Sequence, residues 1–181
     1  ACLQALEHPA TAMGNVGAGT GATVGKLCGM ERASKTGIGC YAMALGELQV
    51  AAVVVVNALG DIFDPANGMK IAGLMNEDRT AFGDSCEELW KLGCPQNLFT
   101  GNTTIGAVIT NGQFNKAQMN KIASMTRNAY ARCINPVGTM ADGDSIYAAS
   151  IGDVKADINV TGTLAAHVME RAIVKAVESA R

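Results

Sequence analysis

The sequence predicts an α+β fold in which layers of sheet and helix pack together, within one domain that covers residues 1–181. Two neighbouring apolar runs, 37–45 and 48–58, have the character of strands. The second run is nearly continuous Val and Ala, as in a strand that is covered on both faces. Two amphipathic patterns, over 115–134 and about 161–179, predict helices. Strands that alternate with helices around an apolar sheet indicate a layered architecture.

The composition favours tightly packed layers. Apolar residues make up 49% of the chain but aromatic residues only 4%, so the core must be built from Ala, Val, Ile, Leu and Met. The 21 glycines allow positive φ angles and close approach of one backbone to another. Both features suit closely stacked sheets and helices better than a loose helical bundle.

Turn signals dominate the first half of the chain outside the two strands. The glycine-rich stretch 14–26 is too flexible for a regular element. Segment 63–80 contains an Asp-Pro and an Asn-Gly pair and is expected to be an exposed loop. A short helix is predicted over 84–92, followed by an irregular polar stretch over 93–101.

Regular elements are clearer in the second half. The β-branched residues of 103–110 predict a strand. Asn115 is suited to cap a helix that continues to about residue 134. The remaining expected elements are a turn at 142–144, a strand over 145–151, and a last helix that starts at Thr161 or Thr163 and ends near residue 179.

Charge and hydropathy argue against several classes of function. With a net charge of −2 and no block of like charges, the chain lacks the basic surface that nucleic-acid binding requires. The longest apolar run, 50–58, is too short to span a bilayer, so no membrane contact is expected. Six dispersed cysteines without a CxxC pair argue against zinc and are typical of a reducing compartment, which predicts the cytoplasm. No cofactor is expected.

The glycine-rich stretch permits three interpretations. A nucleotide-binding loop between Gly17 and Lys26 is one, but a phosphate-binding lysine loop needs a glycine where Thr20 stands and a Ser or Thr where Leu27 stands. A dinucleotide fingerprint needs a strand before the glycines, and none is predicted there. The other interpretations are a loop in which backbones pack closely, and an oxyanion site made by backbone amides with Lys26.

Asn102 and Thr103 stand at the mouth of the predicted strand 103–110 and allow self-cleavage chemistry. The Thr103 hydroxyl can attack the carbonyl of Asn102 and form an ester, whose hydrolysis frees the Thr103 amine. An α-amino group has a pKa of about 8, so it can serve as general base for its own hydroxyl. The plainer interpretation is a turn followed by a strand.

Asp142 and Asp144 are separated by one glycine and can converge on one partner. The commoner use of such carboxylates is to cap backbone amides in a solvated turn. Neither His8 nor His167 lies in a recognisable catalytic motif, so a serine–histidine triad is poorly supported.

Taken together and in this order, these stretches resemble the self-processing aminopeptidases that include L-aminopeptidase/D-esterase, β-peptidyl aminopeptidases and nylon-oligomer hydrolase. The resemblance implies that Thr103 is the nucleophile, with Asp142 and Asp144 beside it to orient its hydroxyl and its new ammonium group. It also implies that Asn57 helps to hold the oxyanion and that Lys26 lies near the nucleophile. The stretches that carry it are GNVGAGTGATVGK over 14–26, VVVVNALG over 53–60, NTTIG over 102–106 and NPVGTMADGD over 135–144.

The resemblance implies a four-layer αββα sandwich like that of N-terminal nucleophile hydrolases. Residues 1–102 would then be the end of an α chain and 103–181 the β chain, acting on a peptide or small amide substrate. Family precursors extend upstream of the segment similar to Ala1, so a missing N-terminal portion or a mate chain is expected, together with a homo-oligomer. The residues leave open a non-catalytic fragment, an acyltransferase of the same fold, or a nucleotide-binding module.

Overall fold

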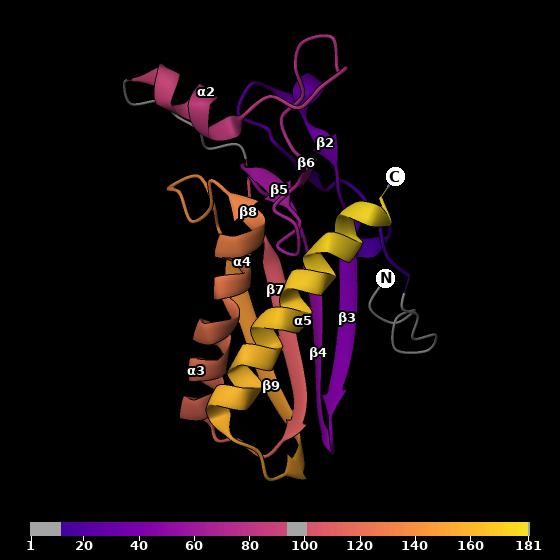
Figure 1. Ribbon diagram of the computed structural model, residues 1–181, viewed down its shortest axis with the longest axis vertical. Coiled ribbons are helices and arrows are strands. Elements are labelled where there is room, and N and C mark those ends of the chain that lie inside the picture. The colour runs from indigo at the N-terminus through magenta and orange to yellow at the C-terminus, as the bar shows by residue number, and fades with distance from the viewer. Residues whose placement is uncertain (1–11, 94–100, 181) are drawn as a thin grey trace.

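The computed structural model describes residues 12–93 and 101–180, and its centre is a four-stranded sheet with the order β3-β4-β7-β9 (Figure 1). β4 pairs in antiparallel fashion with both β3 and β7, whereas β7 and β9 run parallel. The strands predicted in both halves of the chain are therefore confirmed, with slightly shifted ends. Their bounds are Ile38–Leu45 for β3, Leu48–Val55 for β4, Ile105–Gly112 for β7 and Ser145–Val154 for β9.

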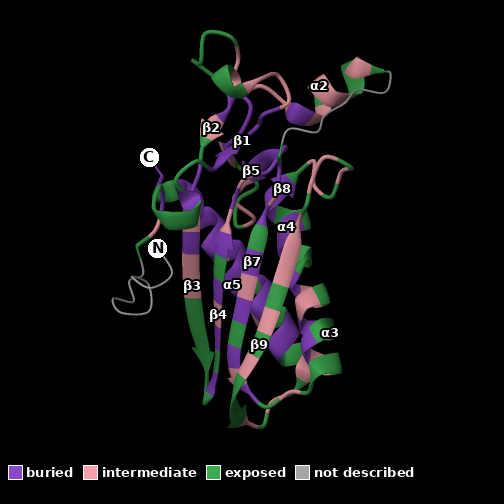
Figure 2. Cartoon of the chain, turned by 180° about the vertical axis from the view of Figure 1, so that it is seen from behind, coloured by how far each residue is buried: buried purple, intermediate pink, exposed green. Residues whose placement is uncertain are grey.

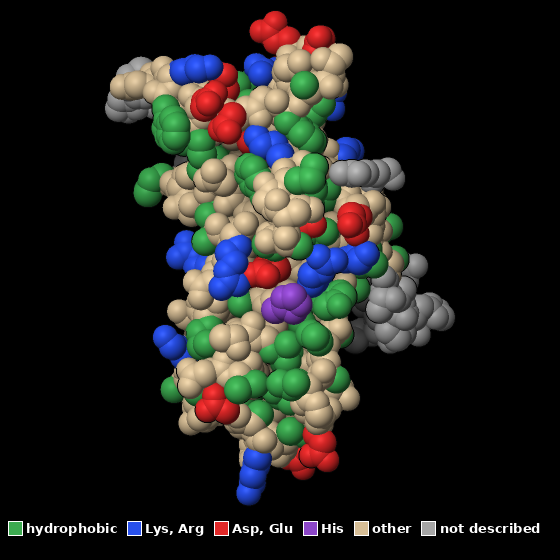
Figure 3. Space-filling view, viewed as in Figure 1, with side chains coloured by type: hydrophobic (Ala, Val, Ile, Leu, Met, Phe, Trp, Pro, Cys, Tyr) green, Lys and Arg blue, Asp and Glu red, His purple; other side chains and the backbone are tan. Residues whose placement is uncertain are grey.

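Three helices lie over one face of this sheet in the described part of the chain: α3 (Lys116–Thr126), α4 (Asn128–Cys133) and α5 (Ile158–Glu178) (Figure 1). The core lies between α5 and β4, where small and branched side chains from both elements are fully buried. Basic and acidic side chains are intermixed on this helical face (Figure 3). None of the helices within 12–93 and 101–180 combines the length and apolar character needed to cross a bilayer.

The helix predicted over 115–134 begins where expected but is divided. Asn115 forms a capping box with Gln118, in which each side chain accepts a hydrogen bond from the other residue's backbone N–H. The hydroxyl of Thr126 then donates to the carbonyl of Ile122 at 2.8 Å, a backbone contact that bends helices. The chain continues as the separate short helix α4 after Arg127.

The last helix starts earlier than predicted. Its N-cap is Asp157, whose carboxylate accepts hydrogen bonds from the backbone N–H groups of Asn159 and Val160. Thr161 and Thr163 lie inside α5, where their hydroxyls donate to carbonyls of the preceding turn. Threonine occurs both as an N-cap and within the first turn of a helix, so the two threonines did not fix the start. Asp157, four positions before Thr161, is the residue that caps the helix.

The opposite face of the sheet is open, which corrects the expectation that the strand at 48–58 is covered on both faces (Figure 2). Its alternating burial leaves Val53 partly exposed, and Ile105 and Ile109 of β7 lie exposed as well. On β9, Tyr147 is 67% exposed and Ile151 73%. Of the four layers that the resemblance implies, the described residues supply this sheet and the helical layer behind it.

Smaller elements gather beyond one end of the main sheet, near the starts of β7 and β9 (Figure 1). The 63–80 segment is more ordered than an exposed loop: its turn signals close a hairpin through Asp64 N and Met69 O at 2.9 Å, and Leu74 is fully buried. The helix predicted over 84–92 is confirmed, and most of 93–101 lies outside the described residues. These elements are η1 (Gly17–Gly19), β1 (Thr23–Val24), η2 (Met30–Arg32), β2 (Ser34–Lys35), β5 (Asp61–Phe63), β6 (Lys70–Ala72), α2 (Ser85–Leu92) and β8 (Ile134–Asn135).

Close contact between α5 and β3 depends on Gly39, and this gives a test of the packing. A Cβ atom there would lie 2.0 Å from the carbonyl oxygen of Ala172 and 2.5 Å from the backbone nitrogen of Ala176. We expect Gly39→Ala to lower the free energy of unfolding by about 1–3 kcal/mol in urea titrations. Gly21→Ala is the matched control, because a Cβ there meets nothing within 4 Å. Equal stabilities of the two variants would contradict this account of the interface.

Candidate active site at the start of β7

The register of the sheet brings three separate segments together just before β7. Val55 of β4 pairs with Ile105, so continuing the antiparallel register sets Asn57 opposite Thr103. Ile105 also pairs with Ser145 in the parallel direction, and the bridge between Asn102 and Asp142 continues that register. A register shift of one residue would turn every side chain to the other face. The pairing of strands therefore assembles this site.

The peptide bond between Asn102 and Thr103 is held on both sides. The Thr103 N–H donates to the carbonyl oxygen of Asn57 at 2.9 Å, and the Asn57 side-chain amide donates to the carbonyl oxygen of Gly101 at 2.9 Å. Asn102 itself is almost fully buried. The backbone around this bond therefore has a defined position before the strand begins.

Two donors meet the carbonyl oxygen of Asn102. The backbone N–H of Gly143 donates to it at 3.0 Å, and the Thr103 hydroxyl donates to it at 2.5 Å. Gly143 has little room for a side chain, because a Cβ there would lie 2.8 Å from the Thr103 hydroxyl oxygen. Donors arranged around a carbonyl oxygen stabilise the negative charge that develops there when the carbon is attacked. The sequence predicts a role for the two aspartates of this turn but carries no signal for the amide between them.

Lys26 comes from the glycine-rich stretch and reaches Asn57, whose carbonyl oxygen also accepts the Thr103 N–H. Its Nζ donates to Asn57 O at 3.1 Å and to Asn57 Oδ1 at 2.9 Å. Burial lowers the pKa of Lys26 to about 8, while the negative charge of Asp142 acts in the opposite direction. A substantial share of this amine is therefore neutral near physiological pH.

Thr23 of the same stretch also reaches the site, where its backbone N–H donates to Asn57 Oδ1 at 3.2 Å, whereas the glycines before it fit the close-packing interpretation. A Cβ on Gly14 would lie 2.1 Å from the carbonyl oxygen of Ser179 at the end of α5. A Cβ on Gly19 would lie 2.4 Å from the backbone nitrogen of Ile38. These glycines let the stretch pack on β3 and α5, and it then carries Lys26 to the site.

Asp142 and Asp144 lie beside the bond between Asn102 and Thr103, but their described hydrogen bonds go to other groups than Thr103. Asp142 accepts from Thr139 N at 3.0 Å and from the Thr139 hydroxyl at 2.7 Å, which is the turn-capping role. Asp144 accepts from the backbone N–H of Thr104 at 2.8 Å. The two carboxylates thus fix the turn and the start of β7, on either side of Thr103.

Asp144 has one oxygen, Oδ2, that is buried and accepts no hydrogen bond from the described residues. Burial raises the pKa of Asp144, and the charge of Asp142 adds to the rise, whereas the Thr104 N–H and Arg127 act against it. The carboxylate borders a cavity of about 280 Å³ that Arg127 and Tyr130 also line. The Tyr130 hydroxyl, which sequence reasoning missed, lies 3.5 Å from Thr104 O and 3.4 Å from Ser145 O.

Comparisons with known proteins match this chain to a peptidase family and to relatives whose names describe hydrolases. The model of peptidase family S58 matches residues 1–181. An uncharacterized aminopeptidase of Mycobacterium leprae is 34% identical over 154 residues, covering 83% of this chain and 40% of that protein. The 6-aminohexanoate-oligomer endohydrolase of Kocuria sp. strain KY2 is 30% identical over 179 residues, covering 90% of this chain and 50% of that protein.

Solved structures share the fold. The PH0078 protein of Pyrococcus horikoshii OT3 superposes with a TM-score of 0.65 at 20% identity, over 99% of this chain and 48% of that one. The L-aminopeptidase D-Ala-esterase/amidase of Ochrobactrum anthropi, described as a variant of the Ntn hydrolase fold, gives 0.64 at 17% identity over 94% and 46%. The chain thus spans about half the length of the relatives and structures it matches.

Proposed function

Because the chain belongs to peptidase family S58, we propose that it carries the nucleophile of an amide or peptide hydrolase, and that Thr103 becomes this nucleophile when the Asn102–Thr103 bond is cleaved. The observation that carries the proposal is the carbonyl of Asn102, which receives hydrogen bonds from both Gly143 N and the Thr103 hydroxyl. The aminopeptidase and endohydrolase names of the relatives support hydrolysis of peptide or amide bonds.

Self-cleavage begins when the Thr103 hydroxyl oxygen attacks the carbonyl carbon of Asn102. The Gly143 N–H stabilises the negative charge on the carbonyl oxygen of the tetrahedral intermediate. The carbon–nitrogen bond then breaks, the Thr103 nitrogen gains the proton that a base has removed from the hydroxyl, and an ester joins the two residues. Water hydrolyses this ester, which leaves a carboxylate on Asn102 and a free amine on Thr103.

A base other than the α-amine must act in this first cleavage, because the Thr103 amine does not yet exist. Lys26 is suited to it: its Nζ and the Thr103 N–H share the Asn57 carbonyl oxygen, and a buried amine is a better base near neutral pH than an exposed one. After cleavage the new amine serves as base for its own hydroxyl, which attacks the substrate carbonyl to form an acyl-enzyme. Asp142 and Asp144 keep the turn and the strand in register.

The direct test of the nucleophile is the intact mass after incubation at neutral pH. We expect wild-type protein to give two species that correspond to 1–102 and 103–181, and Thr103→Ala protein to stay whole and inactive. Thr103→Ser should still cleave, because it keeps a hydroxyl at the same position. Cleavage at this bond in the Thr103→Ala variant, or amide hydrolysis by it at the wild-type rate, would refute the assignment.

The proposed role of Lys26 predicts a pH dependence of self-cleavage. Since the protonated amine cannot accept a proton, the rate should rise about tenfold for each pH unit and level off near pH 8. Lys26→Arg keeps the charge but not the base, so cleavage should slow by about 100-fold or more. Asp142→Asn removes the charge that raises the Lys26 pKa and should move the plateau to lower pH. A rate independent of pH in this range would exclude Lys26 as the base.

We also propose that the open face of the main sheet is covered by a second sheet, supplied by a missing N-terminal portion or a mate chain. Two observations support this: the face carries exposed Val53, Ile105 and Ile109, and the chain spans about half the length of its relatives. Contiguous exposed apolar surface of this kind is typical of an interface.

Co-expression tests this cover. The chain should co-purify with the upstream half of the Kocuria relative, and Ile109→Lys should reduce recovery about tenfold or more, because it buries a charge in the contact. Val160→Lys is the matched control, since Val160 is an exposed apolar residue on α5, in the helical layer. Equal loss in both variants, or undiminished recovery with Ile109→Lys, would contradict the proposal.

A further inference from the structure

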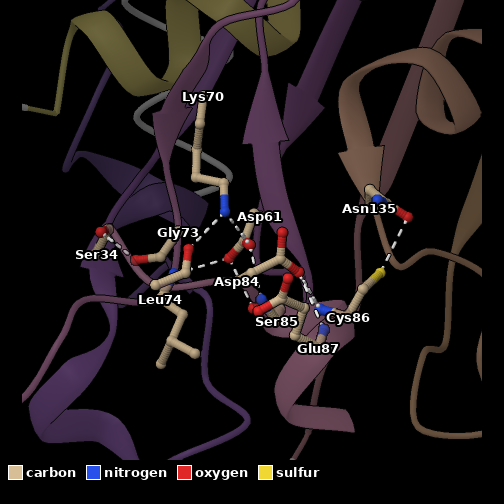
Figure 4. A network of polar contacts seen from close by, with 11 residues as sticks. Ser34, Asp61, Lys70, Gly73, Leu74, Asp84, Ser85, Cys86, Glu87 and Asn135 are labelled. Atoms are coloured by element: carbon tan, nitrogen blue, oxygen red, sulfur yellow. Dashed lines mark hydrogen bonds and ion pairs between the residues drawn. The ribbon is translucent and has the colours of Figure 1, made fainter. Parts of the chain in front are cut away.

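Asp61, the first residue of β5, is a buried carboxylate with a full set of partners (Figure 4). It is 1% exposed and accepts four hydrogen bonds. Oδ1 accepts from Leu74 N at 2.8 Å and from the Ser85 hydroxyl at 2.6 Å, while Oδ2 accepts from Lys70 Nζ at 2.7 Å and from Ser85 N at 3.0 Å. A buried carboxylate is tolerated when it is paired and hydrogen-bonded in this way.

The network fixes the backbone at 73–74 from two sides. Asp61 holds Leu74 N, and the hydroxyl of Ser34 donates to Gly73 O at 2.5 Å (Figure 4). Lys70 extends the same network, because its Nζ also donates to Gly83 O at 2.6 Å. Segments from β2, β5, β6 and the start of α2 are thereby joined around one carboxylate.

The backbone at 73–74 is the surface on which Gly25 rests. A Cβ on Gly25 would lie 1.9 Å from Leu74 N and 2.2 Å from Gly73 C, so the two backbones are in direct contact. On the other side, Gly25 N donates to Gly60 O at 3.0 Å and Lys26 N donates to Leu59 O at 3.2 Å. Gly25 is therefore packed between segments 59–60 and 73–74, and this packing fixes the backbone of the next residue, Lys26.

We propose that Asp61 is a positioning residue for the site, which acts through Leu74 and Gly25 to aim the Lys26 amine at Asn57. Only a carboxylate suits this place, because all four neighbouring groups are donors and an amide would set its own N–H₂ against them. Lys26 makes its two hydrogen bonds to Asn57 from a backbone that directly follows the contact between Gly25 and 73–74. The consequence for catalysis rests on the proposed function, whereas the positioning does not.

The test measures the pKa of Lys26 directly, by competitive acylation at a series of pH values with mass-spectrometric readout, in Thr103→Ala protein that cannot cleave. Asp61→Asn should loosen the backbone under Lys26 and hydrate its amine. The pKa should rise from about 8 toward its ordinary value, lowering the neutral fraction at neutral pH about tenfold. Ser85→Ala, a milder change, removes one bond to Asp61 and should shift the pKa in the same direction.

Glu170→Gln is the matched control. Glu170 is also a buried carboxylate, paired with Arg132 and near His167, but it lies on α5 and has no described contact with the Lys26 segment. It should destabilise the protein without moving the pKa of Lys26. The inference is overturned if folded Asp61→Asn and Ser85→Ala keep the wild-type Lys26 pKa, or if Glu170→Gln raises it equally.

The two proposals fail separately. If Lys26 responds to Asp61 as expected but protein with Thr103 intact never cleaves, the positioning role stands and the proposed function is wrong. If cleavage proceeds but the pKa of Lys26 is unchanged in both Asp61→Asn and Ser85→Ala, the positioning role is wrong. Should Asp61→Asn not fold, Ser85→Ala decides the question.

Discussion

The carbonyl oxygen of Asn57 joins the two halves of the chain at the site. It accepts the Thr103 N–H at 2.9 Å and the Lys26 amine at 3.1 Å, so the residue before β7 and the glycine-rich stretch meet on one atom. Its position follows from the antiparallel pairing of β4 with β7, which continues past the strand ends. Because that pairing is set by which face of the strands is buried, the core beneath the sheet determines where Thr103, the proposed nucleophile, lies.

The electrostatics of the site come from partial burial. Lys26 is mostly buried, and the cost of its desolvation lowers its pKa, whereas Asp142 limits the effect. Asp144 is shifted in the direction expected of a buried carboxylate, upward. The shift at Lys26 increases the neutral share of its amine near physiological pH, which suits proton transfer, whereas the shift at Asp144 reflects its burial. Lys26 and Asp144 thus hydrogen-bond to the backbone on either side of the site and also have shifted pKa values there.

The asymmetry of the fold is its other constraint. One face of the sheet is closed by α3, α4 and α5, and the other carries exposed Val, Ile and Tyr side chains (Figure 2). Thr103 lies at the start of β7, between the main sheet and the smaller elements that Asp61 ties together. The proposed nucleophile, Thr103, directly precedes β7, whose exposed Ile105 and Ile109 lie on the open face, so the proposed interface adjoins the candidate site.

Local sequence patterns were sufficient to predict much of the secondary structure of this protein. Continuous Val and Ala at 48–58, the β-branched run after Thr103 and the cap at Asn115 predicted strands and a helix start that the structure contains. The same patterns could not reveal that β4 has an open face, that Thr126 ends α3, or that Asp157 begins α5. Those outcomes depend on what packs opposite each residue and on competition between hydrogen-bond acceptors.

The candidate site also has features that the sequence predicts and features that only the tertiary structure reveals. The sequence alone determined which side chains are candidates for the chemistry, since Lys26, Asn57, Thr103 and the two aspartates stand in stretches that resemble a known family. Only the tertiary structure decided that the Gly143 amide meets the Asn102 carbonyl, that Asp142 and Asp144 bond to Thr139 and Thr104, and that Asp61 supports the Lys26 backbone. A backbone amide has no sequence signature, and its direction is set by the register between strands that are distant along the chain.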